Sequence, residues 1–216
     1  MKKVVFILVF SFVTIGMFAQ FQRRDSNRIG ITAGVNQFTL NSSNFSNKSG
    51  MGWNAGLSIR GNFYNDFDMV WAIQFSENTF SVGTRKGLVN EDVKFKLDAA
   101  QFALQLSYKI IENHLSVELG PTVQIHGKFT IDSDKESNEV VLDNGTIVKA
   151  KELTEISKFD FYPSVGLTAG IRHLRLNIQY QYCVNNMLSG LNSNIETYKG
   201  FKANPGILSA NLIVYL

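Results

Sequence analysis

The 216-residue sequence contains a single cysteine, three prolines and almost no stretch with the apolar spacing of a helix. Because Cys183 has no second cysteine to pair with, an internal disulfide and a disulfide-stapled mini-domain are excluded. Charge is nearly balanced: two of the 21 basic residues are Lys2 and Lys3, and the remaining 19 face 18 acidic residues. This balance gives no electrostatic reason to expect a nucleic-acid partner.

The N-terminus has the pattern of a secretory signal peptide. Met1-Lys2-Lys3 supplies the positive end, the uncharged segment 4–19 follows, and Ala19 is a small residue at a suitable cleavage position. A membrane-anchor helix is the alternative, but this segment is shorter than the ~20 residues that such a helix needs. We therefore expect residues 1–19 to be removed and residues 20–216 to form one exported domain.

Alternation of apolar and polar residues dominates the rest of the sequence. In the segment 174–182, LRLNIQYQY, leucine, isoleucine and tyrosine occupy one side, and arginine, asparagine and glutamine occupy the other. This two-residue period is typical of a β-strand with one apolar and one polar face. Eight segments share the pattern and are predicted as strands: residues 28–38, 52–63, 68–79, 98–110, 114–126, 158–171, 173–183 and 206–216.

Short and long connections alternate between these eight segments. Long polar connections are expected near residues 39–50, 80–96, 127–157 and 183–205, which places all of them at one end of the sheet and the tight turns at the other. Within the third of them, Asn144-Gly145 lies between β-branched runs and predicts a type I′ hairpin.

The pattern itself leaves open which face of the sheet is in water. In a soluble lipocalin-like barrel the apolar faces would line the interior, whereas in a membrane barrel they contact lipid and the polar faces are enclosed. Strands that match the ~9 to 11 residues crossing a bilayer, polar faces with few charges, and aromatic residues toward strand ends all favour the membrane. The aromatic residues expected at the membrane interface are Trp53, Trp71, Tyr108, Tyr180 and Tyr182. The sequence thus predicts an all-β fold, a closed antiparallel eight-stranded up-and-down transmembrane β-barrel.

Four strand segments and the end of the leader resemble a known family. The segments are GITAGVN (30–36), GWNAGL (52–57), VELGPTVQI (117–125) and VGLTAGIR (165–172), and the leader ends in FAQ. Together they resemble the PorT-like outer-membrane β-barrel family, small eight-stranded barrels of Gram-negative bacteria. The resemblance implies residence in the outer membrane, with tight turns in the periplasm and long loops at the cell surface. Some members are similar to accessory components of a protein secretion system.

The lumen of an eight-stranded barrel is barely wide enough for its own side chains, so we expect the enclosed polar residues to fill it. Charged residues in that space would be costly unless they are paired. We predict one polar network in the lumen, formed by Arg60, Gln105, Glu118, Gln124, Arg175 and Gln179. A narrow selective solute path along the same residues is the alternative.

No arrangement of residues predicts catalysis, a metal site or a cofactor. Of the three histidines, His114 and His173 fall in or beside tight turns, and no serine flanks His126 in the spacing used by barrel lipid hydrolases. The acidic segment 132–136, DSDKE, lacks the glycine and the spacing of a calcium loop. We expect a monomeric, non-enzymatic barrel with no cofactor and no bound metal.

The expected role is a structural scaffold in the outer membrane, in contact with its lipid, whose surface loops bind another protein, glycan or lipid. Residues 127–157 and 183–205 are the expected contact loops, because the chain departs there from repetitive strand chemistry. The alternatives are an accessory subunit of a protein secretion or envelope-assembly system, and a narrow solute channel.

Overall fold

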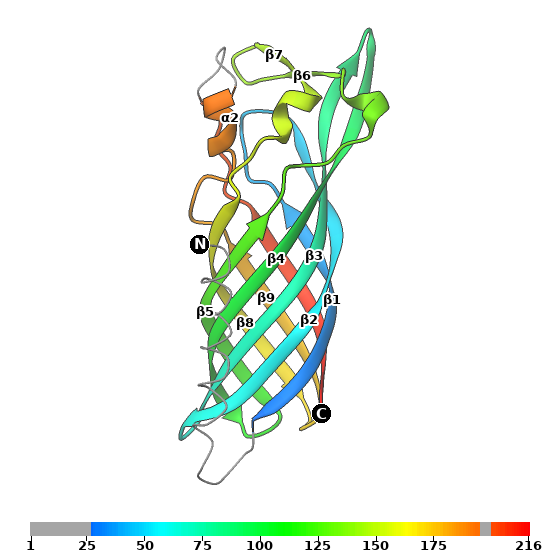
Figure 1. The fold of residues 1–216 in the computed structure, drawn as a ribbon. Helices are drawn as coiled ribbons and strands as arrows, with labels where there is room; N and C mark the ends of the chain where they lie inside the picture. Colours follow the sequence, from blue (N-terminus) through cyan, green and yellow to red (C-terminus); the bar gives the residue numbers. More distant parts are fainter. Residues whose placement is uncertain (1–26, 195–199) are drawn as a thin grey trace, which may run out of the picture.

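The computed structural model describes residues 27–194 and 200–216, and the predicted signal peptide lies outside the described residues. Ten strands form one sheet, and eight of them close into a ring (Figure 1). The eight are β1 (Arg28–Thr39), β2 (Asn47–Tyr64), β3 (Phe67–Lys86), β4 (Val89–Ile111), β5 (Leu115–His126), β8 (Phe159–Gly170), β9 (Leu174–Tyr182) and β10 (Gly206–Tyr215).

Every neighbouring pair of strands in the ring is antiparallel. β5 and β8 pair across the longest connection, and β1 closes the ring by pairing with β10 from Gly30↔Tyr215 to Thr39↔Gly206. A ring without a free strand edge pairs its backbone groups internally, as a lipid environment requires. The prediction of a closed antiparallel eight-stranded up-and-down barrel is confirmed.

Three tight turns lie together at one end of the barrel, at the bottom of Figure 1. Two of them contain an asparagine in the left-handed region, Asn65 with φ of 45° and Asn113 with φ of 61°. Asparagine tolerates this conformation better than most residues. In barrels of this type the short turns face the periplasm and the longer connections face the cell exterior, so we call the two ends periplasmic and extracellular.

The connection between β3 and β4 differs from the prediction of a long polar loop over residues 80–96. β3 continues to Lys86 and β4 starts at Val89, so two residues, Gly87 and Leu88, form the whole turn. Gly87 has φ of 62°, a conformation that favours glycine. β4 has 23 residues, about twice the ~10 that cross a bilayer, so this hairpin extends well beyond the membrane.

Short elements cover the extracellular end of the ring (Figure 1). They are β6 (Glu139–Val141), β7 (Ile147–Lys149), the 3₁₀ helices η1 (Ser133–Lys135) and η2 (Ala150–Thr154), and α2 (Ser189–Asn194). β6 pairs with β7 and, at Arg85↔Glu139, with β3, which extends the protruding β3–β4 hairpin into a four-stranded sheet. Within the described ranges, no helix is long and apolar enough to cross a membrane.

The β6–β7 hairpin forms at the predicted Asn144-Gly145, but its turn is not of type I′. The Gly145 N–H donates to the Leu142 carbonyl at 2.9 Å, and the Leu142 N–H donates to the Thr146 carbonyl at 2.8 Å. Gly145 has φ of 81°, whereas Asn144 does not have the positive φ that a type I′ turn requires. The geometry is that of a type I turn followed by a left-handed glycine.

Candidate functional site

In the part of the barrel next to the periplasmic end, the apolar strand faces point outward and the polar faces point inward. On β9, Leu176 and Ile178 are about half exposed, whereas Asn177 and Gln179 are buried. The other strands of the ring repeat this orientation. A soluble lipocalin-like barrel would require the opposite orientation, so the structure excludes that alternative.

The five aromatic residues predicted at the membrane interface all point outward, with 42 to 56% of their surface exposed. Trp71 and Tyr108 lie near the periplasmic ends of β3 and β4, and Trp53, Tyr180 and Tyr182 lie toward the other end of their strands. Amphipathic rings at two levels are what the two interfaces of a bilayer favour.

The two faces of the sheet exchange character partway along the barrel, as β4 shows. Its outward residues change from charged to apolar in the order Asp92, Lys94, Lys96, Asp98, Phe102, Leu106, Tyr108 and Ile110. Its buried residues change in the opposite sense, from apolar to polar, in the order Val93, Phe95, Leu97, Gln101, Gln105 and Ser107. The outer surface is therefore in contact with lipid on the periplasmic side of about Asp98 and with water on its extracellular side, where the interior becomes apolar. The predicted polar interior holds inside the membrane but not beyond it.

Arg60 on β2 lies at the centre of a buried ion-pair cluster near the periplasmic end. Its guanidinium donates to Glu118 on β5, to Asp68 Oδ2 on β3 at 3.2 Å, and to Ser107 Oγ on β4 at 2.8 Å. Glu118 Oε2 also accepts from Asn177 Nδ2 on β9 at 3.0 Å, so both carboxylate oxygens are used. The cluster therefore connects five strands across the lumen and compensates the charges that it buries.

Gln105 and Gln124 are buried in the lumen but lie outside the hydrogen bonds of the Arg60 cluster. Gln105 Nε2 donates to Ser164 Oγ at 3.1 Å. Gln124 Nε2 donates to Gln101 Oε1 at 3.2 Å and to Gln181 Oε1 at 3.1 Å. The predicted single network is thus divided into separate groups along the lumen.

Arg175 and Gln179, the last two predicted members, are buried on β9 without side-chain hydrogen-bond partners among residues 27–194 and 200–216. Arg175 is 3% exposed, and its side chain makes no hydrogen bond or ion pair with the described residues. The Gln179 Nε2 amide is likewise buried without a partner among them. The structure thus brings Arg60 and Glu118 together, whereas these two side chains make no hydrogen bond within the described part of the chain.

A buried histidine–aspartate pair above the lumen was not predicted. His126 Nε2 on β5 lies 2.6 Å from Asp160 Oδ2 on β8, and neither side chain is exposed. Asn185 donates to the other oxygen of Asp160, and His126 Nδ1 lies 3.4 Å from the Gly127 carbonyl. Both residues have inward parity in the sequence, but their contact depends on the β5–β8 register, which a connection of more than thirty residues leaves undetermined.

This arrangement leaves His126 without the contacts of a catalytic base. Both ring nitrogens face acceptors, and no serine, threonine or cysteine of the described chain is hydrogen-bonded to either of them. Nor does any group of three His, Cys, Asp or Glu residues in the described ranges have the geometry to hold a metal ion. The pair is suited to hold β5 and β8 together.

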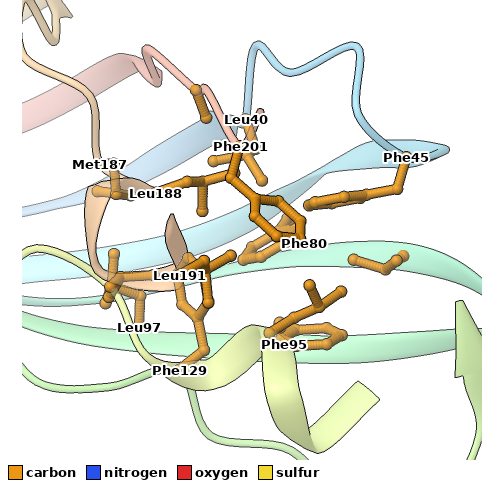
Figure 2. Close-up of a cluster of buried hydrophobic side chains, with 14 of the residues drawn as sticks. Leu40, Phe45, Phe80, Phe95, Leu97, Phe129, Met187, Leu188, Leu191 and Phe201 are labelled. Carbon is orange, nitrogen blue, oxygen red and sulfur yellow. The ribbon is translucent and has the colours of Figure 1, made fainter. Parts of the chain in front are cut away.

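The extracellular end of the ring is filled by a hydrophobic cluster, here called the cap core (Figure 2). Its members come from β1, β3, β4, β8 and β10 and from the extracellular connections. Its large members include Phe38, Leu40, Phe45, Phe80, Phe95, Phe129, Tyr162, Met187, Leu188, Leu191 and Phe201. The sequence signal was the alternation of Phe80, Val82, Val93 and Phe95 inside the segment that we predicted as a loop.

Phe80 lies at the centre of the aromatic part of the cap core. Its ring centroid is 4.9 Å from that of Phe129, 5.3 Å from that of Phe95 and 5.7 Å from that of Phe38. Phe80 and Phe95 come from the protruding hairpin, Phe38 from β1 and Phe129 from the connection after β5. These contacts between rings fill the extracellular end of the barrel with closely packed side chains.

Comparison with known proteins gives structural neighbours. No protein-family model and no curated protein sequence matches the chain. Similar solved structures include Ail, the attachment invasion locus protein of Yersinia pestis (14% identity, TM-score 0.45, covering 89% of this chain and 100% of that chain). Neisserial surface protein A is also similar (14% identity, TM-score 0.48, covering 88% of this chain and 99% of that chain). By its own closed ring and outward apolar band, this protein is an integral β-barrel of the outer membrane.

Proposed function

We propose that this barrel is a non-conducting, non-enzymatic scaffold that presents a prefolded extracellular platform to a partner protein. The platform consists of the β3–β4 hairpin beyond the membrane together with β6, β7, η1, η2 and α2. The cap core is the observation that carries the proposal, because the extracellular connections bury their own apolar side chains against the end of the barrel. Segments that are already ordered lose little conformational entropy when a partner binds.

Exposed apolar side chains on the platform favour a protein as the partner. Leu88 and Val89 at the tip of the β3–β4 hairpin are 101% and 66% exposed, and Val141 and Ile147 are opposite each other on the β6–β7 hairpin, about half exposed. All four lie above the level at which the outer face of the barrel turns polar, so lipid does not cover them. Apolar side chains exposed to water are typical of protein-binding surfaces.

An ion pair fixes η1 to the protruding hairpin, but it is exposed. Lys135 Nζ lies 2.8 Å from Glu91 Oε1, and this hydrogen bond lowers the pKa of the Glu91 carboxyl. Since the folded pKa lies below the unfolded one, the pair contributes above the unfolded pKa, and the contribution is lost as the pH falls through the folded pKa. Exposed pairs contribute little to stability, so the cap core is the feature that keeps the platform folded.

We expect the purified barrel to show no stepped conductance in planar lipid bilayers. The Arg60 cluster fills the lumen, and the cap core closes the extracellular end. Arg60→Ala is expected to remain silent as well, because the cap core still blocks the path. Conductance steps in the wild type that change in size with Arg60→Ala would establish the solute channel instead.

A photo-crosslinking residue at Leu88 is the test of the platform. In intact cells it should give a reproducible protein adduct, whereas the same residue at Lys202, which is exposed in the connection before β10 and outside the platform, should not. The adduct should disappear when Val89 is replaced by aspartate while the barrel still migrates as folded in unheated electrophoresis. Adducts of equal strength at both positions, or adducts with lipid alone, would contradict the proposal. An adduct with another envelope protein would support the role of an accessory subunit.

A further inference from the structure

An open groove lies on the outer wall of the barrel, where β10 passes between β1 and β9. Its volume is about 240 Å³, and the residues that line it are Gln37, Thr39, Asn41, Tyr180, Gly206 and Leu208. None of these six residues belongs to the platform or to the polar groups of the lumen. The groove is therefore a separate feature of the outer surface.

A glycine at an outward position of β10 forms the floor of the groove. The outward positions that follow it along the strand carry side chains, beginning with Leu208, whereas Ile207 points into the barrel. A Cβ atom at Gly206 would lie 2.8 Å from the hydroxyl oxygen of Tyr180, which extends over this position from β9. A larger side chain at residue 206 would thus occupy the space that the groove now provides.

The groove lies where the outer wall changes from apolar to polar at the extracellular side. On β1 the outward residues Ile31 and Val35 are apolar and about half exposed, and the next outward residue is Gln37. Leu208 and Tyr180, also about half exposed, continue the lipid-facing surface on β10 and β9. The groove therefore begins in the hydrocarbon region and opens toward the headgroups of the extracellular leaflet.

The lining offers neutral hydrogen-bonding groups, and all six of its residues are uncharged. The Gln37 amide and the Tyr180 hydroxyl make no hydrogen bond with residues 27–194 and 200–216. Amide and hydroxyl groups both donate and accept, so they match the hydroxyl groups of a sugar. A phosphate or ammonium headgroup would find no side chain of opposite charge in this lining.

We propose that this groove binds the neutral sugar headgroup of a glycolipid in the extracellular leaflet. The sugar hydroxyls hydrogen-bond to Gln37 and Tyr180, and the hydrocarbon chains continue past Leu208 along the lipid-facing wall. A glycolipid matches both the polar part and the apolar part of the lining, whereas a free sugar matches only the polar part. The site is independent of the partner that binds the platform.

Native mass spectrometry of the full mature barrel in dimethylamine-oxide micelles tests the proposal. Monogalactosyl diacylglycerol and phosphatidylcholine with the same acyl chains are added at equal concentrations, and the barrel should retain the galactolipid in preference. Gly206→Leu fills the groove and should weaken galactolipid binding by at least about tenfold, because hydrogen bonds and apolar contact are lost together. The matched control Ala210→Leu adds the same side chain two residues along the outward face of β10, outside the groove, and should leave binding unchanged.

Two further variants separate recognition of the sugar from a general affinity for lipid. Gln37→Ala and Tyr180→Phe each remove one exposed hydrogen-bonding group, so both should still migrate as folded in unheated electrophoresis, even if Gly206→Leu does not fold. Each should weaken galactolipid binding by at least about threefold and leave the retention of phosphatidylcholine unchanged. Equal retention of the two lipids would overturn the proposal, as would galactolipid binding that both variants leave unchanged or that Ala210→Leu weakens as much as Gly206→Leu.

Discussion

Replacing Arg60 by methionine is expected to lower the free energy of unfolding by about 3 to 5 kcal/mol, the usual cost of removing one partner of a buried ion pair. The variant leaves Glu118 in the lumen with neutral donors only, and it leaves Asp68 with Lys109 alone. Methionine keeps much of the side-chain volume, so the lost charge dominates the effect. Urea unfolding of the refolded barrel in micelles at pH 7 measures it.

The double variant Arg60→Met/Glu118→Leu shows whether the unpaired charge is the cause. Removing both charges should recover a large part of the stability that the single variant loses, because no unpaired carboxylate remains next to position 60. Arg85→Met, at an exposed position of β3, should change the free energy of unfolding by less than about 0.5 kcal/mol. A double variant no more stable than Arg60→Met would show that the unpaired Glu118 carboxylate is not the cause of the stability lost in the single variant.

Replacing Phe80 by alanine is expected to cost about 3 to 5 kcal/mol in the packing of the cap core. The side chain is 1% exposed, and three other phenylalanine rings lie within 5.7 Å of its centroid. The loss should be local, because the membrane section of the ring keeps its hydrogen-bonded ladders. Protease added to intact cells should therefore cleave the segment 127–157 in the variant at least about tenfold faster than in the wild type.

Leu88→Ala provides the matched control for Phe80→Ala. It also removes a large apolar side chain from the β3–β4 hairpin, but from a fully exposed position. It should leave the cleavage rate of the segment 127–157 unchanged. Equal cleavage of the wild type and Phe80→Ala would mean that the order of the extracellular connections does not depend on the cap core. That result would contradict the proposal of a prefolded platform.

The ring itself could be predicted from the sequence, because alternation records which residues share a face of a strand. The inward parity of Arg60 and Glu118 followed from the same rule, and the structure places them in contact. In the membrane section lipid surrounds the whole barrel, so the apolar face of each strand points outward and the polar face points into the lumen. Nothing further about the tertiary structure was needed for this part of the fold.

The extracellular part could not be predicted because the same alternation carries the opposite meaning there. In β4, Lys94 and Lys96 occupy outward positions and Phe95 and Leu97 occupy inward positions, which violates the rule that holds from Phe102 onward. Charges at outward positions suggested a loop, although they mark a strand that has left the membrane. Contacts such as His126 with Asp160 depend on register across a long connection, which local sequence does not encode.

The cap core extends across the strand pair that closes the ring. Phe38 and Ile207 belong to it and are directly opposite each other in the ladder that joins the first strand to the last. The contact between these two residues forms only when the ends of the chain have met, so the cap core is complete only after the ring has closed. A chain whose ring has not closed leaves apolar side chains of the cap core in contact with water, and exposed apolar surface of this kind promotes aggregation.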